Sequence, residues 1–165
     1  MILNLVLLLF VILLLSSVVR GAPFVPTHGS RVARMIELSE LKPGEKAADL
    51  GSGDGRIVIA MARIGAIAHG YEINPFLVWW SRYKIRRAGL QDQAFIHLGS
   101  FWSKDLSKFD VVTVFGTTHI MKGLEKKLKK ELKSNARVIS YVFAFPSWEY
   151  AQKESAIFVY RQVQI

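Results

Sequence analysis

The sequence predicts an α/β protein with a doubly wound, mostly parallel sheet, preceded by an N-terminal transmembrane helix. Three observations lead to this fold class. After residue 45, apolar strand-like runs alternate with helix-like segments, as in sheets whose parallel strands are joined by crossover helices. A glycine-rich turn, GSGDG at 51–55, joins the first of these runs to a helix. Residues 2–19 are almost entirely apolar, and a length of 165 residues leaves room for one domain behind them.

The N-terminal segment 2–19 reads ILNLVLLLFVILLLSSVV. Its only polar members are Asn4, Ser16 and Ser17. As a helix it would be about 27 Å long, enough to cross the hydrocarbon core of a thin bilayer. No basic residue precedes it, and a cut after Ala22 would leave Arg20 where a signal peptide needs a small residue. We therefore predict a retained membrane anchor over 1–20, with a cleaved or organelle-targeting segment and a buried soluble helix as the alternatives.

Net charge and cysteine content limit the partners, the location and the chemistry that the domain can have. Residues 1–19 carry no charged side chain, so the formal net charge of +9 belongs to the remainder of the chain. This excess indicates an anionic neighbour, which could be nucleic acid, a lipid surface or an acidic protein. Because Arg20, Arg31 and Arg34 follow the anchor, the positive-inside rule places the domain in the cytoplasm. The absence of cysteine excludes disulfides and a cysteine nucleophile.

The predicted elements follow in order from residue 21. Residues 21–30 (GAPFVPTHGS) are rich in Pro, Gly and small polar residues and form a linker or loop, which leaves 31–165 for the domain. Helices are predicted at 31–41, 55–64, 75–89 and 119–134. Strands are predicted at 46–50, 66–73, 93–99, 109–116, 136–145 and 156–165. Since 146–155 is too short for a crossover helix, the last strand should return antiparallel in an otherwise Rossmann-like sheet.

The turn AADLGSGDGR at 47–56 lies where open α/β sheets bind ligands, between the end of a strand and the start of a helix. Its third glycine comes one residue too early for the dinucleotide motif G-x-G-x-x-G, and the phosphate-binding motif G-x-x-x-x-G-K-[ST] is absent. Asp49 and Asp54 would repel a pyrophosphate but suit a cofactor that carries an ammonium and a sulfonium. Glu72 ends the second strand at the position that suits ribose hydroxyls. These features predict S-adenosylmethionine as the cofactor, against the alternative of a plain tight turn.

Several longer motifs then point to one family. They are DLGSGDGRIVIA (49–60), GYEINPFLVWWSR (70–82), GSFWSKDLSKFDVVTVFG (99–116), MKGLEKKLKKEL (121–132) and FAFPSW (143–148). Together they resemble the small seven-strand methyltransferases related to the mitochondrial protein-lysine methyltransferases of the adenine nucleotide translocase and the ATP synthase c-subunit. The resemblance runs from about Pro23 to Trp148 and suggests a short, prokaryotic-type homologue. That family also carries a hydrophobic segment before its domain.

The resemblance implies a set of cofactor-binding residues. They are Pro26, Thr27, Asp49, Gly51, Ser52, Gly53, Glu72, Asn74, Gly99, Ser100, Phe101 and Phe115. In this assignment the 49–53 residues line the methionine part, Glu72 takes the ribose hydroxyls, and 99–101 flank the adenine. Phe24 stands where the family usually has tyrosine, so any contact of that hydroxyl is lost. The family's last pair of strands is expected to be reduced here to one.

The acceptor is expected at the loop after the strand 109–116, which reads Phe115-Gly116-Thr117-Thr118. It is not the Asp/Asn-Pro-Pro-aromatic signature of many nucleic-acid base and glutamine methyltransferases, which disfavours those substrates. A lysine acceptor has a pKa of about 10.4 and must first lose a proton, which an aromatic, desolvated pocket promotes. The candidate catalytic residues are Phe115, His119 and Trp148, with Phe145 as a further pocket wall. The simpler alternatives are core packing for the aromatic residues and a solvent-facing role for His119.

Two predicted basic helices give information about the binding partners of the protein. The helix 119–134 carries six lysines opposite an apolar side, and the helix 75–89 combines Trp79, Trp80 and Tyr83 with four cations. Each helix presents either a solvated face or a surface that binds an anionic membrane leaflet. The chain is thus predicted to be a single-pass membrane protein that methylates lysine in a protein substrate, without a metal. Its domain would lie on the cytoplasmic side, or at the mitochondrial inner membrane in a eukaryote. The alternatives are an RNA or small-molecule methyltransferase and a non-catalytic cofactor-binding module, and nucleic acid is disfavoured as a partner.

Overall fold

The computed structural model describes residues 27–163. The predicted anchor over 1–20, most of the predicted loop over 21–30, and Pro26 lie outside the described residues. Within residues 27–163, no helix is long and apolar enough to cross a membrane.

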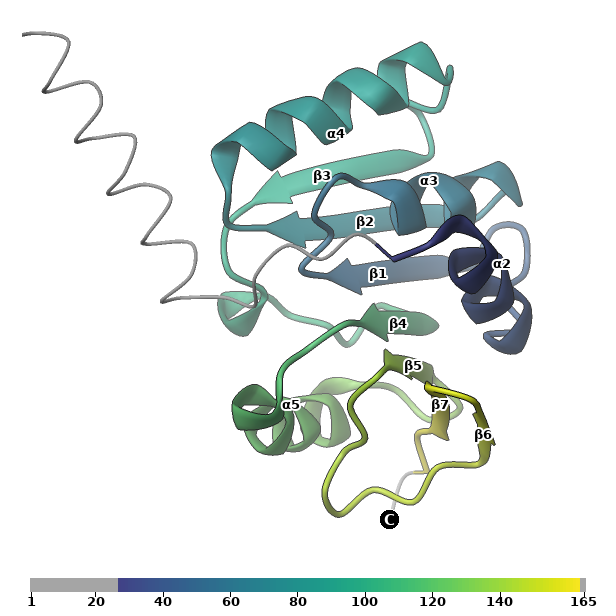
Figure 1. The fold of residues 1–165 in the computed structure, drawn as a ribbon, viewed down its shortest axis with the longest axis vertical. Helices are drawn as coiled ribbons and strands as arrows, with labels where there is room; N and C mark the ends of the chain where they lie inside the picture. The colour runs from purple at the N-terminus through teal and green to yellow at the C-terminus, as the bar shows by residue number, and fades with distance from the viewer. Residues whose placement is uncertain (1–26, 164–165) are drawn as a thin grey trace, which may run out of the picture.

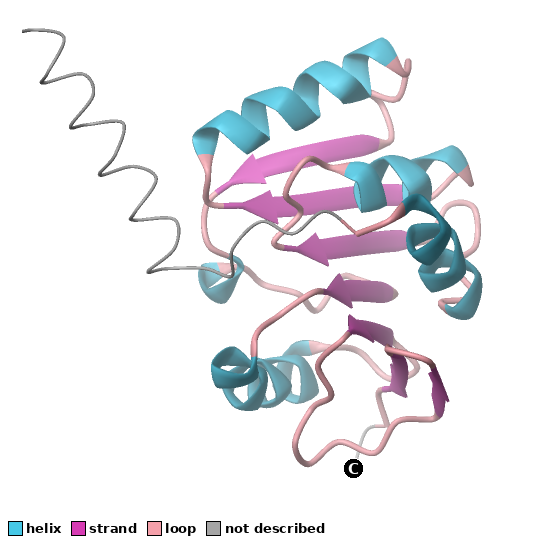
Figure 2. Cartoon of the chain, viewed as in Figure 1, coloured by secondary structure: helices cyan, strands magenta, loops and turns pink. Residues whose placement is uncertain are grey.

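A single mixed sheet of seven strands forms the centre of the protein (Figures 1 and 2). The elements in chain order are α2 (Gly29–Leu38), β1 (Lys46–Leu50), α3 (Arg56–Arg63), β2 (Ile67–Glu72), α4 (Pro75–Arg87), β3 (Ala94–Leu98), the 3-10 turn η1 (Phe101–Ser103), β4 (Val111–Val114), α5 (Thr118–Glu131), β5 (Arg137–Tyr141), β6 (Gln152–Glu154) and β7 (Ile157–Arg161). The spatial order is β3-β2-β1-β4-β5-β7-β6. Strands β1 to β5 are parallel, and β7 is antiparallel to both β5 and β6.

Helices cover both faces of this sheet, as the alternating sequence predicted. On one face α2, α3 and α4 bury apolar side chains such as Met35, Met61 and Ile85 against the strands. On the other face α5 buries Leu124 and Leu128 against the central strands. Alternate residues of each strand therefore face two separate cores, which explains why the central strands are mostly apolar on both sides.

Local sequence explains where α4 begins and ends. The Asn74 side-chain oxygen accepts hydrogen bonds from the backbone N–H groups of Phe76 and Leu77, and Pro75 takes the first helical position. Gly89 follows the helix with a left-handed φ of +67°, which favours glycine. The predicted helix 75–89 is confirmed, with its last turn shortened by two residues.

The antiparallel return predicted for the last strand is confirmed, because β7 pairs antiparallel with β5. The expected reduction of the last pair to one strand is wrong. A three-residue strand, β6, pairs with the outer side of β7 and completes the seven strands. β6 has no apolar alternation, and its first two residues are exposed, so no hydrophobic pattern marked it in the sequence.

Candidate active site

Many of the predicted site residues lie at the carboxyl edge of the sheet. Leu50 of β1 lies opposite Tyr71 of β2 on one side and Val114 of β4 on the other. Val114 in turn lies opposite Ser140 of β5. The next positions along the four strands therefore lie along one edge. They are the glycine loop, Glu72, Phe115 and Tyr141. Ligands of open α/β sheets bind at this edge.

The glycine loop is held in a conformation that requires glycine. Gly51, Gly53 and Gly55 have φ values of +83°, +52° and +76°, a left-handed region that L side chains rarely adopt. The N–H groups of Gly51 and Ser52 donate to the Tyr71 carbonyl at 2.9 and 3.0 Å, which ties the loop to β2. A Cβ added at Gly51 would meet no atom within 4 Å, so space is open in front of the loop at this point.

Asp49, the last acidic residue before the loop, is buried at the end of β1, with 3% of its surface exposed. Its Oδ1 accepts a hydrogen bond from the Thr113 hydroxyl at 2.7 Å, and no described residue donates to its Oδ2. Burial raises the pKa of Asp49 to about 7 against the effect of the Thr113 hydrogen bond, and the nearby Glu72 and Asp54 carboxylates raise it further. A cation placed at the free oxygen would relieve this unfavourable charge.

Glu72 connects the glycine loop to the start of α4. Its two carboxylate oxygens accept from the backbone N–H groups of Gly53 at 2.9 Å and Asn74 at 2.8 Å. A carboxylate has about four lone-pair sites, so Glu72 keeps acceptor capacity for ligand hydroxyls. The side-chain oxygen of Asn74 caps α4, which gives that residue a structural role beside its predicted place near the ribose.

Two cations neutralise the charge of Asp54. Asp54 forms ion pairs with Arg56 at 2.8 Å and Lys84 at 2.9 Å. Burial alone would raise the pKa of Asp54, but the hydrogen bonds from Arg56 and Lys84 outweigh it and hold the pKa at about 2. The negative charge available to a ligand is therefore that of Asp49 and Glu72, and Asp54 serves to fix the loop. Arg56 also donates to the carbonyl of Thr27 at 2.7 Å, which brings the predicted contact Thr27 to this edge.

The Ser52 side chain points beneath the loop. A Cβ added at Gly70 of β2 would lie 2.6 Å from the Ser52 hydroxyl oxygen, so these two residues are packed against each other. The hydroxyl is buried and has no hydrogen-bond partner. The backbone of Ser52 is also engaged, since its N–H donates to Tyr71 and its carbonyl accepts from the Gly55 N–H at 2.8 Å, so the predicted contact of Ser52 with the cofactor stays a prediction.

The residues predicted to flank the adenine follow β3 at the same edge. The N–H of Gly99 donates to the Glu72 carbonyl at 2.9 Å, so this segment runs beside Glu72. The Ser100 hydroxyl caps the turn η1 by accepting from the Trp102 N–H at 3.3 Å. Phe101 is half-buried and packs against the core beneath α5. Gly99, Ser100 and Phe101 thus follow β3 at the carboxyl edge of the sheet, and their contact with an adenine stays a prediction.

The aromatic residues predicted at the acceptor site fall into two groups. Phe115 lies edge-on to Tyr141 at 5.2 Å and stacks on Phe143 at 6.3 Å between ring centroids. Phe145 and Trp148 pack instead on Tyr160, at 4.9 and 5.4 Å. Phe145 is buried, and Trp148 lies beneath the Lys129 ammonium. The structure therefore groups Phe115 with Tyr141 and Phe143, and it places Trp148 in the packing of the sheet on α5.

His119 lies exposed in the first turn of α5. Its Nε2 is 3.0 Å from the Thr117 hydroxyl, and no described acidic residue contacts the ring. Its predicted role as a proton acceptor stays a prediction. In residues 27–163 there is no cluster of three or more His, Asp or Glu side chains that could hold a metal ion.

Four residues that the sequence analysis did not select support this site. They are Thr113, Ser81, Tyr141 and Phe143. Ser81 is fully buried, and its hydroxyl donates to the Gly53 carbonyl at 2.9 Å. Thr113 is the one polar residue of the VVTV strand, and it lies opposite Asp49 of β1. A single polar residue in a buried strand was a signal from which its role could have been predicted. Tyr141 and Phe143 carried no such signal, since they end an apolar strand.

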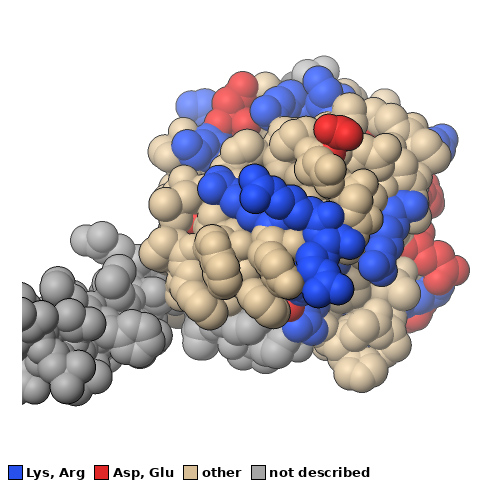
Figure 3. All heavy atoms as spheres, turned by 90° about the horizontal axis from the view of Figure 1, so that it is seen from above, with Lys and Arg blue, Asp and Glu red and all other residues tan. Residues whose placement is uncertain are grey.

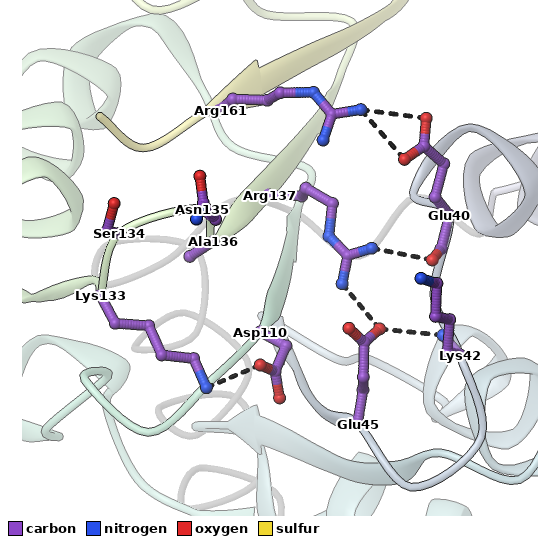
Figure 4. A pocket seen from close by; sticks show the side chains of 10 residues that line it. All are labelled: Glu40, Lys42, Glu45, Asp110, Lys133, Ser134, Asn135, Ala136, Arg137 and Arg161. Atoms are coloured by element: carbon purple, nitrogen blue, oxygen red, sulfur yellow. Dashed lines mark hydrogen bonds and ion pairs between the residues drawn. The ribbon is translucent and has the colours of Figure 1, made fainter. Parts of the chain in front are cut away.

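A cavity at the opposite, amino-terminal edge of the parallel strands is separate from this site (Figure 4). Apart from Lys42, its charged side chains are paired with one another: Arg137 with Glu45, Lys133 with Asp110 and Arg161 with Glu40. This cavity lies at the other end of the strands from the glycine loop. Its ion pairs connect the segment after α2 to β5 and β7, which indicates a structural role.

The sheet order, the glycine loop and the two buried acids define the class: this is a seven-strand, Rossmann-like methyltransferase fold. The family model described as the ANTKMT methyltransferase domain matches residues 49–152, and the chain belongs to that family. This confirms the family that the sequence motifs indicated.

Relatives and a solved structure agree with this assignment. The chain is 43% identical to the Homo sapiens lysine N-methyltransferase of the ATP synthase c-subunit over 126 residues, which are 76% of this chain and 54% of the human protein. It is 37% identical to a protein-lysine N-methyltransferase of Saccharolobus islandicus, covering 80% of this chain and 83% of that protein. An RNA methyltransferase from Salinibacter ruber in complex with S-adenosyl-L-homocysteine has a TM-score of 0.79 and 35% identity, covering 84% of this chain and 92% of that one. The chain spans about half the length of the vertebrate relatives.

Proposed function

We propose that this protein is an S-adenosylmethionine-dependent methyltransferase that modifies lysine in a protein substrate at or near a membrane. The observation that carries the proposal is the pair of buried carboxylates, Asp49 and Glu72, on either side of an open glycine loop in a chain of this family. The names of the human and archaeal relatives support a lysine acceptor.

The residues of the loop fit such a cofactor. S-adenosylmethionine supplies an electrophilic methyl group on a sulfonium, so the protein needs to align the acceptor and exclude water. Asp49 would hold the ammonium of the methionine part through its free oxygen, next to the backbone of Gly51 and Gly53. Glu72 would bind ribose hydroxyls while keeping its hydrogen bonds to the loop. Gly99 to Phe101 would flank the adenine, Asn74 would lie close to the ribose, and Thr27 would contribute a further cofactor contact.

The acceptor lysine would enter beside Phe115. The three rings of Phe115, Tyr141 and Phe143 stand at the ends of β4 and β5, next to the glycine loop along the strand order. Aromatic walls disfavour the charged ammonium by desolvation, and a cationic sulfonium nearby would do the same. Both effects make the neutral, nucleophilic amine more accessible at neutral pH.

Substitution of the two predicted aromatic residues should give opposite results. Phe115→Ala is expected to lower the initial rate of methyl transfer about 10- to 100-fold, because alignment of the acceptor is lost. Trp148→Ala is expected to lower the free energy of unfolding by about 3 kcal/mol, as core aromatic truncations do, with a rate per folded molecule close to wild type. Thermal unfolding and methylation rates of both variants check this. A catalytic defect confined to Trp148→Ala would contradict the assignment.

The proposal includes a membrane location. The apolar composition of residues 2–19 and the basic residues that follow support a single-pass anchor with the domain on the cytoplasmic side, or at the mitochondrial inner membrane in a eukaryote. An anionic lipid surface would then account for part of the net charge of +9.

A second candidate acceptor is RNA. The observation that favours it is the 35% identity to the Salinibacter ruber protein, which is named an RNA methyltransferase and aligns over most of both chains. A small-molecule acceptor and a cofactor-binding module without activity are the further alternatives.

Labelled S-adenosylmethionine distinguishes these acceptors. The full chain is incubated with host membrane and soluble fractions, with and without nuclease, and the labelled band is examined by mass spectrometry. We expect label on lysine of a membrane-fraction protein that survives nuclease treatment. Label that disappears with nuclease would establish RNA as the acceptor instead, and absence of cofactor binding in calorimetry would refute the enzyme proposal altogether.

A further inference from the structure

Helix α4 has two contrasting faces. Val78, Ser81 and Ile85 are buried against the sheet. The outward face carries four large aromatic side chains, here called the α4 aromatic stripe. They are Phe76, Trp79, Trp80 and Tyr83, which are 65%, 60%, 40% and 43% exposed. Their spacing of three and four residues places them side by side, with neighbouring ring centroids 5.5 to 6.3 Å apart. A contiguous exposed patch of this kind marks an interaction surface.

The charged residues of this helix are all basic. α4 contains Arg82, Lys84, Arg86 and Arg87 and no acidic residue. Lys84 pairs with Asp54, and Arg82 donates to the Ile96 carbonyl. No carboxylate of the described chain lies within ion-pair distance of Arg86 or Arg87. Figure 3, which looks onto the protein from the α4 side, shows Lys and Arg side chains running across the middle of this face beside uncharged residues.

The lysine-rich helix α5 differs in this respect. Two of its five lysines, Lys127 and Lys129, pair with Glu131 and Glu125 of the same helix, and Lys133 just beyond it pairs with Asp110. Its apolar residues Met121, Leu124 and Leu128 are all buried in the core. α5 therefore offers a solvated face with partly neutralised charge and no aromatic residue of the Phe, Trp or Tyr type, whereas α4 offers exposed aromatic rings next to Arg86 and Arg87.

The described chain also begins close to α4. The Thr27 carbonyl accepts from Arg56, Arg56 pairs with Asp54, and Asp54 pairs with Lys84 in the last turn of α4. Thr27 follows Arg20 by seven positions, a span of at most about 25 Å when fully extended. A bilayer that holds the apolar segment 2–19 would thus lie within reach of the α4 surface.

We propose that the α4 aromatic stripe docks into the headgroup region of an anionic bilayer, with Arg86 and Arg87 on lipid phosphates. Tryptophan and tyrosine favour this region because their rings are apolar and their N–H and O–H groups stay wet. This inference rests on the proposed membrane anchor. Because α4 begins shortly after Glu72, docking would hold the cofactor site at the level of the membrane surface, where a lysine close to a bilayer is presented.

Tryptophan quenching by brominated phospholipids tests this directly. The chain has four tryptophans, so Trp102→Phe/Trp148→Phe leaves only the α4 pair and Trp79→Phe/Trp80→Phe leaves only the other two. Each full-length variant is reconstituted into vesicles of brominated phosphatidylcholine, alone or with roughly a third phosphatidylglycerol. We expect strong quenching of the α4 pair, greater on the anionic vesicles, and little quenching of Trp102 and Trp148.

A charge-matched pair of variants then tests the role of the cations. Arg86→Gln/Arg87→Gln should weaken docking of the stripe about thirtyfold, because each cation near an anionic surface contributes about 1 kcal/mol. Lys122→Gln/Lys126→Gln, which removes the same charge from α5, should leave quenching unchanged.

The outcomes separate the inference from the proposals on which it rests. A chain that does not float with vesicles would refute both the anchor and the docking surface. A chain that floats while its α4 tryptophans stay unquenched would refute the docking surface alone. A concentration-dependent shift of α4 emission in detergent without lipid would show that a second copy covers the stripe, which also overturns lipid docking. Calorimetry with S-adenosylmethionine on the same preparation reports the proposed enzymatic function independently.

Discussion

Replacement of Asp49 with asparagine is expected to stabilise the ligand-free protein and to abolish detectable S-adenosylmethionine binding. Burial raises the pKa of Asp49 from 3.8 to about 7, so the folded protein holds an ionised carboxylate there only at a cost. One pKa unit corresponds to about 1.4 kcal/mol, which makes this cost about 4 kcal/mol at pH 8. Asparagine removes the charge and can still accept the Thr113 hydrogen bond. It cannot neutralise a ligand ammonium.

The sign of the pH dependence follows from the raised pKa. The cost of the Asp49 carboxylate appears as the pH rises above 3.8 and is complete above about 7. The stability gained by Asp49→Asn should therefore be largest at pH 8 and fall by more than half at pH 5. Chemical denaturation at both pH values measures it, with Asp92→Asn, an exposed acid, as a control expected to change stability by less than about 0.5 kcal/mol. A destabilised Asp49→Asn protein at pH 8, or one with unchanged cofactor affinity, would contradict this account.

Glu72→Ala should weaken S-adenosylmethionine binding at least 100-fold and, unlike Asp49→Asn, destabilise the fold. Glu72 accepts hydrogen bonds from the N–H groups of Gly53 and Asn74, and a hydrogen bond to a charged group contributes about 1.5–3 kcal/mol. Alanine leaves both donors without a partner and removes the proposed contacts with the ribose. Calorimetry measures the affinity, and the amide resonance of Gly53 in an NMR spectrum reports whether the loop has loosened.

A conservative variant keeps this prediction testable if Glu72→Ala folds poorly. Glu72→Gln retains one acceptor oxygen and the shape of the side chain, so it should fold and bind with an intermediate affinity. Glu149→Ala, at an exposed position far from the loop in sequence, serves as the control and should bind as wild type. Wild-type affinity in both Glu72 variants would remove Glu72 from the site.

Much of the fold could be predicted from the sequence because its signals are local. The predicted strand 46–50 coincides with β1, and most other predicted ends lie within about three residues of those observed. The short strand β6 was missed because it is an exposed edge without alternation, paired through the backbone of β7 alone. The cofactor loop was also predictable, since three glycines and the acids Asp49 and Glu72 carry their meaning in spacing and residue type.

The acceptor side was less predictable because it depends on packing between distant segments. Phe115, Phe145 and Trp148 are equally plausible pocket walls in the sequence. Only the turn of the chain after β5 places Phe143 on Phe115 and leads Phe145 and Trp148 away to Tyr160. Likewise, the sequence analysis placed the charge of Asp54 near the cofactor. In the structure this charge is neutralised by ion pairs with Arg56 of α3 and Lys84 of α4.

The sequence by itself determined the α/β order of the elements, the family, the glycine loop and the apolar composition of the N-terminal segment. These depend on residue type and on spacing along the chain, which hold before the chain folds. The tertiary structure decided which acid is neutralised by ion pairs, which aromatic rings gather beside Phe115, and which basic helix sets exposed aromatic rings beside its cations. Those properties depend on burial and on contacts between segments far apart in sequence, and they arise only when the sheet brings those segments together.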